Sequence, residues 1–112
     1  MKIHLNFNSK QLARAYNIIE SLNAANREGN SFRNIRYMYN KTMDCCLIVA
    51  YEEFGHDADG VYQSSVYKCI DKDANVQDCG VGLDRSQFLT LLGQMVEIEL
   101  RGGKFQIKFD EE

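Results

Sequence analysis

Residues 9–26, SKQLARAYNIIESLNAAN, form the longest periodic stretch of the sequence, and the expected fold is arranged around them. Apolar side chains recur there at intervals of three and four, as on one face of an α-helix. These are Leu12, Ala15, Tyr16, Ile19 and Leu22. Ser9 carries the hydroxyl group of a typical N-cap, and Gly29 lies shortly beyond the last periodic residue. The stretch therefore predicts a helix over residues 9–26 that packs through its apolar face.

The same helix has a second stripe that is polar and net basic. Its members recur at helical spacing and are Lys10, Arg14, Asn17 and Ser21. An acidic side chain, Glu20, lies only at the border of the stripe. Surface helices commonly carry such residues, so one interpretation is an ordinary solvated face. The other interpretation is a surface that contacts phosphate groups.

The totals set limits on the class of protein. A length of 112 residues predicts one domain, residues 1–112, and 45% hydrophobic residues suffice for a core. The net charge of -3 argues against indiscriminate coating of nucleic acid. No apolar run is long enough to span a membrane, and the alternating N-terminus is unlike a signal peptide. We therefore expect no membrane association, a cytoplasmic location, and four cysteines kept as thiols.

The rest of the chain predicts mainly strands. Alternating or continuous apolar runs predict strands at Met1–Phe7, Phe32–Tyr39, Cys45–Tyr51, Val61–Ile70, Val81–Leu83, Val96–Leu100 and Phe105–Phe109. Cys45–Tyr51 has no polar side, so it is expected to be central, whereas Glu52–Gly60 and Asp71–Gly80 are expected to be polar loops. Asp84 and Gln87 have the spacing of a capping box that begins a second helix, which ends near Gly93. The order β-α-β-β-β then β-α-β-β is a pseudo-repeat of elements within an α+β domain.

Four segments resemble one domain of the DNA sliding clamps, most closely of the bacterial polymerase processivity clamp. They are MKIHLNFNSKQLARAYNII, CCLIVAYEEFG, GVGLDRSQFLTLLGQM and VEIELRGGKFQIKF. The resemblance is one of pattern over nearly the whole chain. It implies two β-sheets backed by two helices on one face. Because clamp subunits carry two or three such domains and this chain carries one, a ring would require a homo-oligomer.

The resemblance also implies a function, which is non-enzymatic. The helices would face duplex DNA and contact its phosphates, as expected of a processivity factor for DNA replication with a polymerase-like partner. The single-domain length suggests an origin in a phage or mobile element. The nucleic-acid-binding residues implied are Lys10, Arg14, Asn17 and Ser21 on the first helix and Arg85 at the start of the second.

The alternative is a small protein-interaction domain that holds or inhibits a partner through edge strands or acidic loops, without binding DNA. An enzyme is disfavoured, because His4 and His56 have no nucleophile at a recognisable spacing, and no catalytic residue is assigned. No metal site and no cofactor are expected. The segment Asp71–Asp78 begins like a calcium loop, but Val76 stands where that loop needs glycine. The cysteines are expected to be structural thiols.

Overall fold

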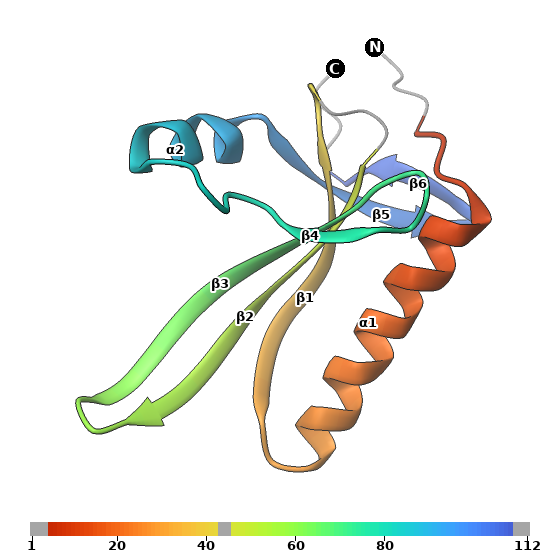
Figure 1. Ribbon diagram of the computed structural model, residues 1–112. Helices are drawn as coiled ribbons and strands as arrows, with labels where there is room; N and C mark the ends of the chain where they lie inside the picture. The colour runs from red at the N-terminus through yellow and green to blue at the C-terminus, as the bar shows by residue number, and fades with distance from the viewer. Residues whose placement is uncertain (1–4, 43–45, 109–112) are drawn as a thin grey trace.

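The computed structural model describes residues 5–42 and 46–108, which form two helices and one six-stranded antiparallel sheet (Figure 1). In chain order the elements are α1 (Ser9–Arg27), β1 (Ser31–Asn40), β2 (Leu47–Asp57), β3 (Gly60–Ile70), β4 (Val76–Asp78), α2 (Arg85–Gly93), β5 (Met95–Arg101) and β6 (Lys104–Ile107). Across the sheet the strands run β4-β3-β2-β1-β5-β6. The α+β class is confirmed. The expectation of two sheets is wrong, because β1 pairs with both β2 and β5 and so joins all the strands.

Helix α1 forms where the sequence predicts it, but its cap and its buried face differ by one residue. The N-cap is Asn8, whose side chain accepts a hydrogen bond from the Gln11 amide, while the Gln11 side chain accepts one from the Asn8 amide. Ser9 is therefore the first helical residue and not the cap. The buried stripe is centred on Gln11, Ala15 and Leu22, whereas Tyr16 is 64% exposed. The polar side chain of Gln11 thus lies on the sheet, at a position outside the apolar face expected from the sequence.

Strand β2 is central, as predicted, with β3 on one side and β1 on the other. Leu47 and Val49 face α1 and form the main core with Ala15, while Ile48 and Ala50 are buried on the opposite face. The acidic loop expected at 52–60 is wrong. Residues 52–57 continue β2, and Glu52 pairs with Ser65 of β3. Cross-strand pairing over the whole length of a hairpin thus outweighs the low strand propensity of its acidic residues.

Of the two short strands expected to precede the helices, one lies largely outside the described residues and the other is displaced along the chain. Met1–Phe7 includes residues 1–4, which lie outside those residues, and Leu5–Phe7 is irregular, although the Phe7 ring packs edge-on against Tyr39 and Phe105. Val81–Leu83 belongs to a turn. The strand before α2 is instead β4, inside the expected loop Asp71–Gly80. The second part therefore keeps the expected order β-α-β-β, as β4, α2, β5 and β6, with its first strand at Val76–Asp78 instead of Val81–Leu83.

The remaining local predictions hold where the signals are strongest. Asp84 caps α2, with its carboxylate accepting from the Gln87 amide and the Gln87 side chain accepting from the Asp84 amide. The Gly102-Gly103 turn joins β5 to β6, and Arg101 pairs with Lys104. At the other end of α1, the Asn26 side chain exchanges two hydrogen bonds with the backbone of Phe32 and so fixes the start of β1.

The two helices lie on opposite faces of the sheet, which contradicts the single helical face expected. Ala15 of α1 packs in the cluster that contains Val49. Phe88 of α2 contacts the ring of Tyr67, and Tyr67 pairs with Ala50. Because successive strand residues point to opposite faces, Ala50 and Tyr67 lie on the face away from α1. Figure 1 shows the two helices far apart on either side of the strands.

Candidate functional site

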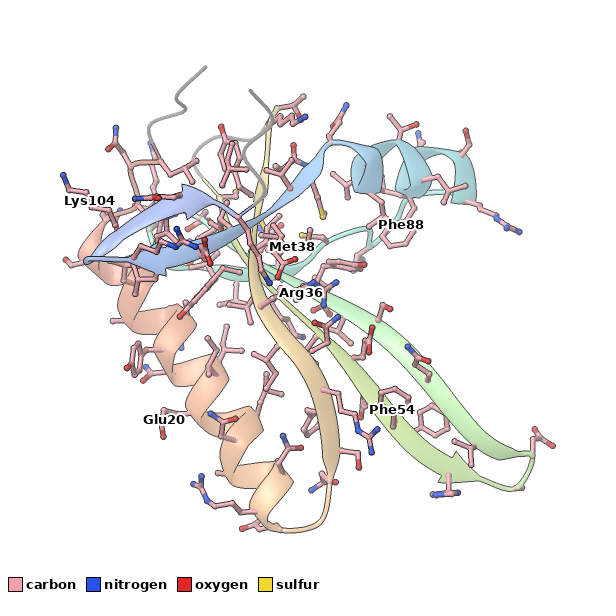
Figure 2. All side chains as sticks on the ribbon, turned by 180° about the vertical axis from the view of Figure 1, so that it is seen from behind. Glu20, Arg36, Met38, Phe54, Phe88 and Lys104 are labelled. Carbon is pink, nitrogen blue, oxygen red and sulfur yellow. The ribbon has the colours of Figure 1, made fainter. Side chains whose placement is uncertain are left out.

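The basic stripe of α1 is exposed, as a surface for phosphate contacts requires. Lys10, Arg14, Asn17 and Ser21 all lie in the exposed class. Each stands one residue before a position of the sheet-facing stripe, so the basic stripe runs along the flank of α1 and not along its outermost side. Glu20 projects from α1 away from the sheet (Figure 2).

The stripe lies beside the loop 71–75. The Arg14 Nε atom donates to the backbone oxygen of Ala74 at 3.4 Å, and the Asn8 side chain donates to that of Lys72 at 2.7 Å. These contacts hold the loop 71–75, with its carboxylates Asp71 and Asp73, beside the start of α1. The Asp71 carboxylate accepts from two amides of its own loop, those of Asp73 and Asn75. An aspartate that closes its own turn explains the calcium-like spacing without an ion.

Arg85 is not part of the same surface. It begins α2, and α2 lies on the sheet face opposite α1. The structure therefore brings together four of the five predicted nucleic-acid-binding residues and separates the fifth. The spacing within α1 predicts its basic stripe, and the capping box places Arg85 at the start of α2, but neither signal predicts the side of the sheet on which each helix packs.

A second candidate is the outer edge of β3 from Gly60 to Val66, called here the β3 free edge. Strand β4 covers β3 only where Lys68–Ile70 pairs with Val76–Asp78, and the Cys79 amide adds a bond of 2.8 Å to the Tyr67 oxygen. Within residues 5–42 and 46–108, no strand pairs with the outer side of residues 60–66. A strand edge of this kind presents unpaired backbone donors and acceptors to solvent.

The direction of these backbone groups follows from the register. The Tyr67 oxygen points away from β2, toward β4, and in an antiparallel strand every second residue points the same way. Val61, Gln63 and Ser65 therefore direct both their amide and their carbonyl outward. The intervening residues use theirs in the unbroken pairing with β2.

The side chains of the β3 free edge are uncharged. Residues 61–66 read VYQSSV, and Val61 is 71% exposed. Proteins normally protect long strand edges with lysine, proline or a β-bulge. Residues 60–66 contain neither lysine nor proline, and their register with β2 is regular, without a bulge. The sequence predicts the strand but not its free edge, because that depends on β4 ending after three residues.

In the described part of the chain, no group of three or more His, Cys, Asp or Glu side chains is placed to hold a metal ion. Cys46 is buried, while Cys69 and Cys79 are half-buried free thiols. Among the same residues, no helix is long and apolar enough to cross a membrane.

Comparison with protein-family models, with curated proteins and with solved structures finds no match for this chain. The interpretation of its function therefore depends on the geometry of the two candidate surfaces.

Proposed function

We propose that this protein is a non-enzymatic interaction module that binds an extended segment of a partner protein by adding it as a strand along the β3 free edge. The observation that carries the proposal is the open edge of residues 60–66, with the backbone groups of Val61, Gln63 and Ser65 directed outward. Strand addition draws its affinity from main-chain hydrogen bonds and its specificity from alternate side chains.

The neighbouring residues indicate what such a segment would resemble. Val61 and Tyr62 leave 71% and 41% of their surfaces exposed, so the added strand gains apolar contacts near the hairpin end. The central residues Gln63, Ser64 and Ser65 offer only neutral hydrogen-bonding groups. A segment with apolar and small polar side chains fits this edge better than a highly charged one.

Proline substitutions distinguish the outer from the inner backbone groups of β3. Gln63→Pro removes an amide that faces solvent, which an edge strand tolerates. Ser64→Pro removes an amide that faces β2, and we expect it to destabilise the hairpin because it breaks a hydrogen bond of the β2–β3 ladder. The experiment selects binders for the wild-type protein from a random-peptide library, then measures their affinity for both variants.

Strand addition predicts that Gln63→Pro stays folded by circular dichroism yet loses peptide binding. The bound peptide should also slow hydrogen exchange at the amides of Val61, Gln63 and Ser65. Peptides that bind Gln63→Pro as well as the wild type, or that protect other amides instead, would contradict the proposal. Analytical ultracentrifugation shows whether a second copy of the chain occupies the edge instead.

A second candidate function, suggested by the clamp resemblance, is duplex-DNA binding through the stripe of α1. The exposure of Lys10, Arg14, Asn17 and Ser21 favours it. If the stripe contacts phosphates, the double variant Lys10→Ala and Arg14→Ala should weaken binding and reduce the salt slope by about 2. Arg85→Ala is the control on the opposite face. Equal effects of both changes, or no salt-sensitive binding at all, would exclude the stripe as a DNA site.

A further inference from the structure

Three thiols gather on the sheet face away from α1. Cys46 directly precedes β2, Cys69 lies within β3, and Cys79 directly follows β4. Cys69 pairs with Ile48, and the Cys79 amide bonds to the oxygen of Tyr67. Because residues two apart on a strand share a face, Cys46 and Cys79 are both diagonal neighbours of Cys69. The Cys69 thiol makes side-chain hydrogen bonds with both of them.

The pKa values of Cys69 and Cys79 are shifted in opposite directions. The pKa of Cys79 is lowered, because the Cys69 thiol donates a hydrogen bond to its sulfur, an effect that outweighs burial. The pKa of Cys69 is strongly raised, first by the same hydrogen bond and then by burial. If the pair loses a proton, the negative charge therefore resides on Cys79. The thiolate is the reactive form of cysteine toward oxidants.

Cys79 also borders an open hollow in the protein surface. It lines this hollow together with the residues that begin α2, including Arg85 and Phe88. Figure 2 shows Phe88 extending from α2 toward the sheet. Cys79 is half-buried beside this hollow, whereas Cys46, with 5% of its surface exposed, is sheltered. Cys79 thus lies both beside an open hollow and next to the Cys69 thiol.

We propose that Cys79 and Cys69 form a peroxide-sensitive disulfide site. The Cys79 thiolate attacks one oxygen of a hydroperoxide, the O–O bond breaks, and the sulfur becomes a sulfenic acid while the departing oxygen takes a proton. The Cys69 sulfur then attacks the Cys79 sulfur, the S–O bond breaks, and water leaves with the Cys69 proton. In total, two thiols and one hydrogen peroxide give one disulfide and two waters. A thiol reductant reverses the change.

The backbone around Cys79 can accommodate this bond. Diagonal neighbours on a sheet stand farther apart than the Cβ atoms of a disulfide, so Cys79 must move toward Cys69. The three residues of β4 before it are exposed, and Gly80 after it has a φ of +89°, a conformation that other residues rarely adopt. A short edge strand followed by glycine resists such a shift less than a central strand does.

The experiment treats the reduced full chain with hydrogen peroxide, alkylates free thiols before and after reduction, and identifies the modified cysteines by mass spectrometry. We expect a Cys69–Cys79 disulfide within one chain. In Cys69→Ser, which keeps a hydrogen-bond donor but cannot resolve the intermediate, dimedone should trap a sulfenic acid on Cys79. In Cys69→Ala, which lacks the donor, Cys79 should be oxidised more slowly than in Cys69→Ser.

Two further variants serve as controls. Cys46→Ser and Cys45→Ser, the latter at a position outside the described residues, should leave the Cys69–Cys79 disulfide unchanged. Circular dichroism of every variant establishes that the fold is retained. A disulfide that joins other cysteines, a sulfenic acid trapped on Cys69 instead of Cys79, or equal oxidation rates in Cys69→Ser and Cys69→Ala would overturn the proposal.

Discussion

Replacing Gln11 by alanine should destabilise the protein far more than the same change at Gln87. Both glutamines complete a capping box of the same form, with side-chain oxygens 3.0 Å and 3.1 Å from the N-cap amides. Gln87 is exposed, so water replaces its side chain, and the change should cost about 0.5 kcal/mol. Gln11 is 2% exposed, and its Nε2 atom also donates to the Ile70 oxygen at 3.1 Å.

The expected cost at Gln11 is the sum of two losses. Removing the cap bond costs about 1 kcal/mol, and leaving the buried Ile70 oxygen without this donor costs about 2 kcal/mol. The total of about 3 kcal/mol is reduced by a few tenths through the higher helix propensity of alanine. Urea denaturation of both variants, followed by circular dichroism, measures the difference. If the two variants lose stability equally to within about 1 kcal/mol, the coupling of α1 to β3 through Gln11 is refuted.

Three further changes test separate contacts. Gly55→Ala should destabilise the hairpin by no more than about 1 kcal/mol, because a Cβ atom there would lie 2.5 Å from the Tyr62 ring, whose side chain is 41% exposed and can turn away; adding Tyr62→Ala should recover that loss in urea denaturation. Asp78→Asn should lower stability at neutral pH, because the hydrogen bond from Lys68 to Asp78 raises the pKa of Lys68 above its ordinary 10.5. This contribution is complete below pH 10.5 and disappears as the pH rises through the raised pKa, so the wild type and Asp78→Asn should converge in alkaline denaturation. Phe88→Ala should accelerate hydrogen exchange in α2 but not in β2. None of the nine α2 residues, all of them described, is buried, so α2 can open without disturbing the core. Equal acceleration in both elements would show that α2 is integral to the core.

The sequence predicts local structure best where one residue pattern allows one conformation. The helix at 9–26, the capping box of Asp84 and Gln87, and the Gly102-Gly103 turn all form as predicted. Their signals lie within a few residues and depend little on distant contacts. The buried face of α1 is less predictable. Gln11 is buried there with its side chain donating a hydrogen bond to the Ile70 carbonyl, a partner far away in the sequence.

The tertiary arrangement depends on contacts that the pattern does not encode. Residues 52–57 look like a loop because they are acidic and polar, yet pairing with β3 extends β2 through them. The amphipathic pattern of a helix predicts which face of the helix is buried. It does not predict against which side of the sheet that face packs. Such long-range contacts place Arg85 on the face opposite the α1 stripe and leave the β3 free edge uncovered. The candidate sites are therefore predictable from the sequence only in part.

The sheet order has a consequence for how the chain folds. Strands β1, β2 and β3 follow one another in sequence and lie side by side, so their pairing closes only short loops. Strand β5 instead returns to β1 from far along the chain, with Asn40 opposite Met95. Because loop closure costs more entropy over longer separations, the β1–β3 meander should gain protection before β5 does in pulse-labelled hydrogen exchange. Simultaneous protection of β2 and β5 would contradict this order. Until β5 arrives, the β1 side of the meander is a second open edge, and refolding at high protein concentration should be vulnerable to aggregation in that interval.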